Sequence, residues 1–256
     1  MLAYATEHKI PVTALGRGSN LLIRDGGIRG IVFCLCQPAF SSIVVDGCRL
    51  DCGAGAKLKL VAVTARQAGI AGLEFLEGIP GSVGGALRMN AGAMGAWTFQ
   101  AVESVRVMSR EGVARDLPAS QIPSKYRSCP LLLDHFALRA VLKGEPSSSQ
   151  EILARMNAYS RKRWESQPAQ PSAGCIFKNP ATIPAGKLID ELGLKGLRVG
   201  GAAVSDVHGN FIVNQGGATS TDVLALIEEV RSRVRASRGL ELETEVEILG
   251  EDIGCS

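Results

Sequence analysis

Glycines gather in two stretches of the chain whose residue types suit a ligand that carries phosphate groups. The longer stretch runs from Leu73 to Gly95 and reads LEFLEGIPGSVGGALRMNAGAMG. Glycine admits positive φ and lets backbone N–H groups approach a ligand, so such a turn can form a concave donor surface for a pyrophosphate. Pro80 stiffens the turn, and Ser82 adds a hydroxyl donor. The alternative interpretation is a glycine-rich connection that binds nothing.

The shorter stretch, LGRGSNLL, covers residues 15–22. Gly16 and Gly18 can turn tightly, and Ser19 and Asn20 offer donors to a phosphate. This is not a Walker loop, because no Gly-Lys-Ser/Thr follows, and it is not the GxGxxG dinucleotide fingerprint either. Two non-standard phosphate-type loops on one chain predict an extended diphosphate cofactor that is held from both sides.

The composition limits the classes of protein that the chain can belong to. Its 256 residues can form one large domain or two small ones, and 46% hydrophobic and 21% charged residues are typical of globular proteins. A net charge of +3 is too weak to indicate a nucleic acid or a membrane surface as partner. The sequence has no run of about 18 apolar residues and no apolar leader, so we expect neither a membrane span nor secretion.

The seven cysteines form no CxxC pair, and the three histidines are scattered, so we expect neither a metal site nor a disulfide framework. Cys34 and Cys36 are two residues apart, which would place them on one face of a strand as core thiols. Reduced thiols fit the cytoplasm, which is the localisation that we predict.

Hydrophobic periodicity and turn residues predict the elements that must position these stretches. Helices are expected at residues 2–9, 58–69, 149–163 and 187–192, and a long amphipathic helix is expected with Thr221 as its N-cap. Strands are expected at residues 10–15, 31–35, 43–46, 102–108, 113–117, 136–142, 202–204, 211–213 and 245–249. Few strict βαβ units occur, which favours an α+β fold. The breaker-rich segment GEPSSS at residues 144–149 is the best boundary, so we predict domains at residues 1–146 and 147–256.

Longer segments around these motifs resemble one family. The two glycine stretches with their flanks read GRGSNLLIRDGGIRGIV and LEGIPGSVGGALRMNAGA. Further segments are Tyr126-Arg127, PSAGCIFKNP at residues 171–180, AGKLIDELGLKG at 185–196, VHGNFIVN at 207–214 and LETEVEILG at 242–250. In order, and over nearly the whole chain, they resemble the UDP-N-acetylenolpyruvoylglucosamine reductases, flavoenzymes of cell-wall precursor synthesis.

This resemblance implies an FAD-binding portion of two α+β subdomains, of the PCMH type, followed by an α+β substrate-binding domain. Family members normally begin some tens of residues earlier, with a strand and a segment that help to hold the cofactor, so we expect this chain to start inside the first subdomain. The short span between Arg127 and Cys175 implies the family's form without an extra tyrosine-bearing loop over the substrate.

The implied activity is NADPH-dependent reduction of the enolpyruvyl group of UDP-N-acetylglucosamine-enolpyruvate to UDP-N-acetylmuramate, with FAD as the bound cofactor. The expected partners are the UDP-sugar substrate and NADPH, and we expect a monomer that binds neither nucleic acid nor membrane. Two alternatives stay open: another FAD-dependent oxidase of the same cofactor fold, and a non-catalytic flavin-binding remnant.

Three residues match the family's catalytic positions. Hydride addition to the enol ether spreads charge toward the carboxylate, and Arg127 offers that charge a planar, permanently cationic fork, although one arginine of many is usually a surface residue. Glu245 would act with Arg127 around the enol, whereas alternating glutamates alone would indicate a solvated strand face. Cys175 would donate the proton, since a thiol with an ordinary pKa of about 8.5 is mostly protonated at neutral pH. An inert buried cysteine is the alternative.

The glycine stretches and the resemblance together also assign binding residues. Those expected at the cofactor are Gly16, Gly18, Ser19, Asn20, Leu21, Gly78, Ile79, Pro80, Gly81, Ser82, Gly84, Gly85 and Asn90. Those expected at the substrate are Tyr126, Lys178, Asn179 and Lys187. His208 is expected to be structural, because no partner carboxylate is evident in the sequence.

Overall fold

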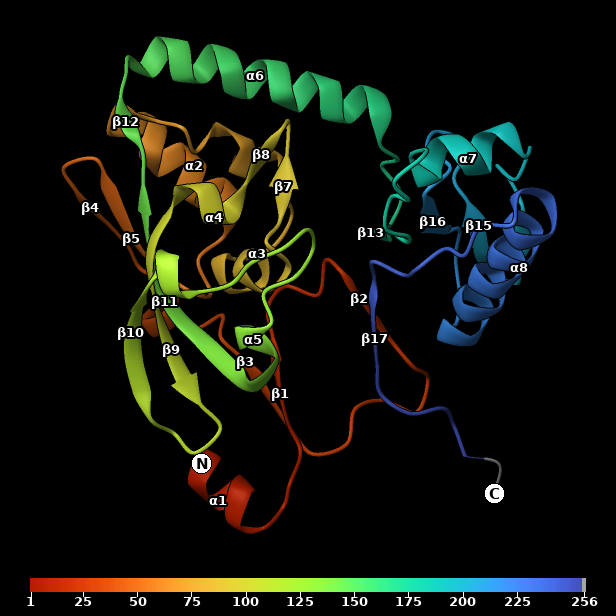
Figure 1. Ribbon diagram of the computed structural model, residues 1–256, viewed down its shortest axis with the longest axis horizontal. Helices are drawn as coiled ribbons and strands as arrows, with labels where there is room; N and C mark the ends of the chain where they lie inside the picture. Colours follow the sequence, from red (N-terminus) through yellow and green to blue (C-terminus); the bar gives the residue numbers. More distant parts are fainter. Residues whose placement is uncertain (255–256) are drawn as a thin grey trace. The chain divides into compact units, whose positions relative to one another are not determined.

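A computed structural model of the chain describes residues 1–254, which form two compact units. Unit 1 comprises Met1–Arg17 and Gly30–Arg163, and unit 2 comprises Gly18–Arg29 and the residues from Trp164 onward. Both units mix helices with antiparallel sheets (Figure 1), which confirms the predicted α+β class.

The main sheet of unit 1 is antiparallel and has the strand order β10-β9-β11-β5-β4. These strands are β4 (Ile43–Asp46), β5 (Arg49–Gly53), β9 (Val102–Ser109), β10 (Ala114–Pro118) and β11 (His135–Lys143). The predicted hairpin of β9 and β10 is confirmed by their register. Strand β5 was not expected, although its alternate residues Leu50 and Cys52 are buried apolar side chains.

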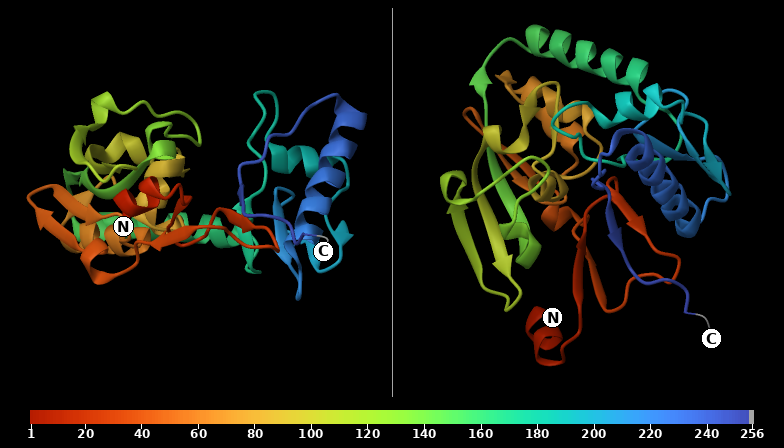
Figure 2. Two further views of the ribbon diagram at one scale, coloured as in Figure 1. Left: turned by 90° about the horizontal axis from the view of Figure 1, so that it is seen from below. Right: turned by 45° about the vertical axis from the view of Figure 1, so that its right-hand side comes forward.

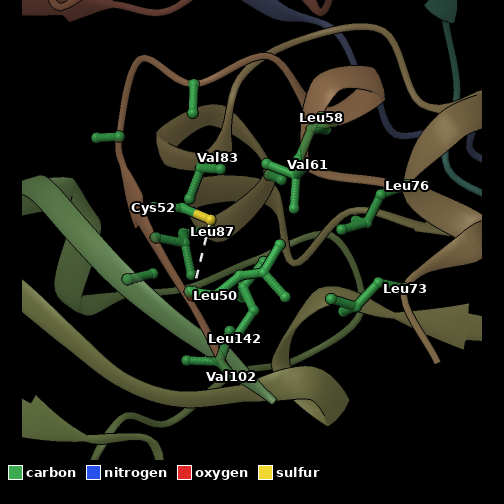
Figure 3. Close-up of a cluster of buried hydrophobic side chains, with 14 of the residues drawn as sticks. Leu50, Cys52, Leu58, Val61, Leu73, Leu76, Val83, Leu87, Val102 and Leu142 are labelled. Carbon is green, nitrogen blue, oxygen red and sulfur yellow. Dashed lines mark hydrogen bonds between the residues drawn. The ribbon is translucent and has the colours of Figure 1, made fainter. Parts of the chain in front are cut away.

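The core of unit 1 lies between this sheet and two helices, α2 (Leu58–Gln67) and α3 (Val83–Met89). Figure 3 shows Leu50 of β5 among Val61 of α2 and Leu87 of α3, and all three side chains are fully buried. The apolar spacing that predicted a helix from residue 58 is therefore the face that α2 buries. Burying a side chain of this size contributes about 1.5–3 kcal/mol.

The other elements of unit 1 are mostly short. The helices are α1 (Leu2–Glu7), α4 (Thr98–Ala101) and α5 (Leu131–Asp134), with 3-10 turns at Pro38–Phe40, Glu74–Gly78 and Ala119–Gln121. The strands are β1 (Val12–Leu15), β3 (Ile31–Cys34), β6 (Ile70–Ala71), β7 (Gly92–Ala93), β8 (Ala96–Trp97) and β12 (Glu145–Pro146). The long helix α6 (Ser149–Ser166) begins at the predicted residue, and its Ile152 and Met156 join the unit 1 core.

The expectation that Cys34 and Cys36 are core thiols is wrong. Strand β3 ends at Cys34, and Leu35 and Cys36 form a turn, so the alternation of strand faces stops before Cys36. Both cysteines are exposed, and the Sγ atom of Cys34 lies 3.2 Å from the Sγ atom of Cys36.

Unit 2 is built on an antiparallel sheet with the strand order β13-β16-β15-β14. These strands are β13 (Ser172–Cys175), β14 (Arg198–Val199), β15 (Ala202–Val204) and β16 (Phe211–Asn214). Helices α7 (Ala185–Glu191) and α8 (Ser220–Arg238) share one apolar core with the sheet, and α8 contacts β14 and β15 (Figure 2). Residues 18–29 join this unit because β2 (Leu21–Ile23) pairs in parallel with β17 (Glu247–Leu249). Strand β17 starts two residues later than expected, so Glu245 precedes it.

The expectation that Thr221 caps the long helix is wrong, because α8 starts at Ser220 and its N-cap is Thr219. Oγ1 of Thr219 accepts the N–H of Asp222 at 3.1 Å, and the Asp222 carboxylate accepts the N–H of Thr219 at 3.0 Å. This reciprocal pair is a capping box, which satisfies two backbone donors that the first turn leaves open.

Asp25, on the segment of residues 18–29, caps the same helix a second time. Its carboxylate accepts the hydroxyl of Thr221 at 2.7 Å, the N–H of Ser220 at 2.8 Å and the N–H of Thr221 at 3.1 Å. These bonds, led by that from the Thr221 hydroxyl, lower the pKa of Asp25 to about 2 from its ordinary 3.8. The carboxylate therefore ties residues 18–29 to α8.

We expect Asp25→Asn to lower the unfolding midpoint in urea at pH 7. We also expect the free energy of unfolding of this variant to fall less than that of the wild type as the pH is lowered. Because the pKa of Asp25 is lower in the folded chain, its stabilisation is present above about pH 4 and is lost as the pH falls toward about 2. Urea unfolding of both proteins between pH 2 and pH 7 measures this, with the exposed Asp46→Asn as a control. Parallel pH curves for wild type and Asp25→Asn would contradict the assignment.

Candidate active site

The two glycine stretches meet in unit 1. Ser82 is the N-cap of α3, and a Cβ placed on Gly16 would lie only 2.8 Å from its Oγ atom. Gly81, directly before Ser82, has a φ of 136°, a conformation that favours glycine. Gly16 and Ser82 thus bring the two stretches together, and the ligand that both would bind stays a prediction.

Backbone packs on backbone at the start of α3. The N–H of Gly84 donates to the carbonyl of Ala54 at 2.7 Å, and the N–H of Val83 donates to the carbonyl of Ala56 at 3.0 Å. A Cβ on Gly84 would lie 3.2 Å from the Cβ and the carbonyl oxygen of Ala54. The region thus joins several backbone segments without bulky side chains between them. The N–H groups of Val83 and Gly84 are thus used within the protein, and a diphosphate contact at this stretch stays a prediction.

The second half of the shorter stretch, residues 18–21, belongs to unit 2. Asn20 donates from Nδ2 to the carbonyl of Glu245 at 3.1 Å, and its own carbonyl accepts the N–H of Glu247 at 3.0 Å. The carbonyl of Ser19 faces Gly174, where a Cβ would lie 3.8 Å away. The cofactor role of these residues stays a prediction, whereas Asn20 has a defined part in holding the Glu245 segment.

The segments of Cys175 and Glu245 lie side by side in unit 2. The N–H of Glu245 donates to the carbonyl of Ile176 at 2.7 Å, and Phe177 forms a bridge with Thr244. Cys175 ends β13 and is half-buried, next to Gly174 with a φ of 79°. The structure therefore brings together two of the three residues predicted to be catalytic.

A buried asparagine fixes the backbone on the other side of this pair. Asn210 is 2% exposed, and its side chain accepts the N–H of Phe177 at 2.9 Å and donates to the carbonyl of Phe177 at 2.8 Å. The carbonyl of Asn210 also accepts the N–H of Ile176 at 2.9 Å. One amide thus satisfies both backbone groups of a buried residue next to the proposed site, which limits its movement.

Arg127, the third residue, lies in unit 1 at the tip of a tight turn. Lys125 and Ser128 exchange backbone hydrogen bonds of 2.8 and 3.2 Å, with Tyr126 and Arg127 between them. Arg127 has a φ of 55°, which is uncommon for a residue other than glycine and is found preferentially at functional sites.

Two aromatic rings face the guanidinium of Arg127. Its Cζ atom lies 5.4 Å from the ring centroid of Tyr126 and 5.6 Å from that of Trp97, within the range of cation–π attraction. The two rings contact each other edge to face, with centroids 5.7 Å apart. Trp97 in turn needs the bare backbone of Gly92, because a Cβ there would lie 2.2 Å from the indole.

Asn90 joins this turn to the helix that follows the glycine stretch. It ends α3 with a φ of 39°, is 8% exposed, and donates from Nδ2 to the carbonyl of Lys125 at 3.2 Å. Its Oδ1 atom accepts the N–H of Phe99 at 3.1 Å, at the start of α4. Its cofactor contact stays a prediction, and its side chain already links three segments around Arg127.

The residues predicted to bind substrate have protein partners in unit 2. Lys178 donates from Nζ to Glu243 at 2.9 Å and lowers the pKa of that carboxylate, while Asn179 accepts the N–H of Ala185 at the start of α7. Lys187 is exposed and lies 3.9 Å from Glu191. The substrate roles of these residues stay predictions.

His208 has a structural environment. Burial lowers the pKa of its imidazole, and its Nδ1 atom accepts the N–H of Asn210 at 3.1 Å. Within residues 1–254, no group of three or more His, Cys, Asp or Glu side chains is placed to hold a metal ion. No helix in that range is long and apolar enough to cross a membrane.

Comparison with family models identifies the class of protein to which this chain belongs. The family model described as an FAD binding domain matches residues 1–117, so the chain is a flavoprotein with FAD as its cofactor, as predicted. A second model, described as the C-terminal domain of UDP-N-acetylenolpyruvoylglucosamine reductase, matches residues 167–249. The chain belongs to the UDP-N-acetylenolpyruvoylglucosamine reductase family. The predicted boundary after residue 146 falls between the two matches and stays a prediction.

Relatives of this family match along most of the chain. The reductase of Novosphingobium aromaticivorans is 45% identical over 244 residues, which cover 94% of this chain and 82% of the relative. The reductase of Bacillus velezensis is 41% identical over 247 residues, which cover 95% and 81%. The crystal structure of the reductase from Thermus caldophilus has a TM-score of 0.83 and 40% identity, covering 97% of this chain and 88% of that chain.

Sequence reasoning missed the residues that hold the site in place. Trp97 and Asn210 belong to no chemical motif, and both act through contacts with segments that are distant in the sequence. A signal was present for Asn210, because a polar amide directly before the apolar run from Phe211 to Val213 would be buried at a strand end. Nothing in the sequence indicated that Trp97 faces Arg127.

Replacing Asn90 tests how the Arg127 turn is held. Asn90→Gly removes both side-chain hydrogen bonds but tolerates the left-handed backbone, and we expect it to lower the free energy of unfolding by about 1–3 kcal/mol. Asn90→Ala adds backbone strain, of about 1–2 kcal/mol more. Urea unfolding measures both losses. If Asn90→Gly equals wild type, the two hydrogen bonds do not stabilise the turn.

Proposed function

We propose that this chain reduces the enolpyruvyl group of UDP-N-acetylglucosamine-enolpyruvate to UDP-N-acetylmuramate, with bound FAD and with NADPH as electron donor. Membership in the reductase family and the match to an FAD binding domain support this reaction over the oxidase and the non-catalytic remnant. The observation that supports the proposal is the backbone bond between Glu245 and Ile176, because it joins the segment of Glu245 to the segment of Cys175.

Arg127 is proposed to stabilise the charge that develops on the substrate. FAD, when bound, would supply the hydride. As the double bond of the substrate is reduced, negative charge spreads toward its carboxylate, and a guanidinium is a permanent cation with a planar fork that fits a carboxylate or enolate. A group already oriented by Tyr126 and Trp97 reorganises little during the reaction, which is what makes such stabilisation effective.

Cys175 is proposed to complete the reaction at the second carbon, and Glu245 to act with Arg127 around the enol. The thiol of Cys175 donates the proton that this carbon gains as the double bond is reduced. Asn20 and Ile176 support this division of roles, because they bond to the two backbone groups of Glu245 and so fix where its side chain begins.

Cations and amide donors stabilise a bound diphosphate. We propose that Lys178, Asn179 and Lys187 bind the diphosphate of the substrate, and that Tyr126 is a further substrate contact. Lys178 would then interact with both Glu243 and the phosphate. NADPH and nucleotide-activated sugars are intracellular metabolites, so we propose a cytoplasmic enzyme. We also propose that it acts as a monomer, because one chain holds all the proposed residues.

Glu245→Gln and Arg127→Ala should separate the two half-reactions. Removing a preorganised group typically costs 10²–10³-fold in rate, so we expect flavin reoxidation by the substrate to slow by about that factor. Flavin reduction by NADPH should stay near the wild-type rate, because that step needs no enolate stabilisation. Stopped-flow absorbance measures both steps, with Glu247→Gln as the control on the same segment. Equal slowing of both steps would instead indicate a role in folding or flavin binding.

Replacing Cys175 tests the proton donor. Cys175→Ala should accept electrons from NADPH but form product very slowly, whereas Cys175→Ser keeps a hydroxyl donor and should retain more activity. Iodoacetamide should inactivate the wild type more slowly when substrate is bound and should leave the serine variant active. Near-normal turnover of Cys175→Ala would leave the thiol with a packing role only.

A further inference from the structure

A second pair of reactive groups lies in unit 1, at the end of β3 and beside the start of the shorter glycine stretch. Cys34 ends β3 and Cys36 follows two residues later, and both are exposed reduced thiols. The thiol of Cys34 donates to Sγ of Cys36 at a sulfur–sulfur distance of 3.2 Å. Two sulfur atoms at this distance need to approach by only about 1 Å to reach the 2.03–2.05 Å of a disulfide bond.

The backbone around the pair holds the two thiols in the same small turn. Cys34 lies opposite Leu15 in the parallel pairing of β1 with β3, and the carbonyl of Cys36 accepts the hydroxyl of Ser41 at 3.2 Å. The carbonyl of Leu35, between the cysteines, packs so closely on Gly55 that a Cβ there would lie 1.6 Å away. The turn is therefore anchored on both sides of the pair.

The other cysteines of unit 1 lack this combination of exposure and a neighbouring thiol. Cys52 and Cys129 are completely buried, so a dissolved oxidant does not reach their thiols. This burial also raises the pKa of Cys52 to about 12 and raises the pKa of Cys129. Cys48 is only half-buried, and no hydrogen bond to another sulfur is recorded for it within residues 1–254. The hydrogen bond with Cys36 raises the pKa of Cys34. The nearby cation of Arg17 has a smaller effect in the opposite direction.

We propose that Cys34 and Cys36 form a redox-sensitive dithiol, which a hydroperoxide or a low-molecular-weight disulfide converts selectively into an intramolecular disulfide. With oxidised glutathione, one thiolate attacks the disulfide and releases one glutathione. The second cysteine then attacks the mixed disulfide, releases the second glutathione and forms the Cys34–Cys36 bond. The two protein sulfurs lose two electrons and two protons in total, and glutathione gains them.

The geometry makes the second step fast compared with competing reactions. A thiol 3.2 Å away acts at an effective concentration far above that of any dissolved thiol, so a mixed disulfide at either cysteine should resolve within the chain. The product closes a small ring at the end of β3 and fixes the Leu35 carbonyl against Gly55. This inference is independent of the proposed enzyme activity.

Peptide mass mapping of the flavin-loaded protein tests the proposal. Trypsin releases residues 30–49 as one peptide that also contains Cys48, so the experiment uses a Cys48→Ser background. After brief treatment with oxidised glutathione and alkylation, we expect this peptide to be lighter than the reduced peptide by two hydrogen atoms. It should carry neither glutathione nor alkyl groups, and dithiothreitol should restore both alkylation sites.

Two matched variants supply the controls. Cys34→Ser and Cys36→Ser, each in the Cys48→Ser background, leave one thiol in the peptide, and each should retain one glutathione because no partner resolves it. Hydrogen peroxide should give the same disulfide in the parent and an oxidised single thiol in each variant. Stable glutathione adducts on the parent peptide, or disulfide-linked dimers on a non-reducing gel, would overturn the proposal.

Discussion

The hydrogen bond from the N–H of Glu245 to the carbonyl of Ile176, 2.7 Å long, is the contact on which the proposed chemistry of unit 2 depends. It joins the segment after β13 to the segment before β17, and neither segment is regular secondary structure at that point. Asn20 completes the arrangement by donating to the carbonyl of Glu245. The shorter glycine stretch therefore supports the Cys175 and Glu245 segments, in addition to any contact with the cofactor.

In unit 1, the side chain of Asn90 stabilises the turn that carries Arg127. An arginine with positive φ is held at the tip of a turn, which costs backbone energy, and the buried amide of Asn90 offsets part of that cost by bonding to Lys125. Asn90 belongs to the longer glycine stretch, so the loop that meets Gly16 through Ser82 is continuous with the segment that supports Arg127. Flavin binding and substrate chemistry would thus share one stretch of backbone.

Local patterns predicted much of this structure. The apolar spacing of α2, the hairpin of β9 and β10 and the start of α6 follow from neighbours in the sequence, and the structure confirms them. Gly16 lies close to Ser82, while the joint binding of a cofactor by the two glycine stretches stays a prediction. One error had a local signal that was missed: Thr219 caps α8 because Asp222, three residues later, completes a capping box, whereas Thr221 donates to Asp25. Strand β3 ends at Cys34, where the chain turns toward Ser41. Long-range partners such as Trp97 for Arg127 have no signature in a single sequence.

A single turnover under anaerobic conditions tests the central claim most directly. The FAD-loaded protein is reduced with one equivalent of NADPH and mixed with UDP-N-acetylglucosamine-enolpyruvate. Flavin absorbance is followed during the reaction, and the mass of the nucleotide sugar is then measured by mass spectrometry. The account predicts that the flavin is reoxidised without oxygen and that the sugar nucleotide gains two hydrogen atoms per flavin. Flavin that stays reduced until oxygen is admitted, with the sugar nucleotide unchanged, would contradict it.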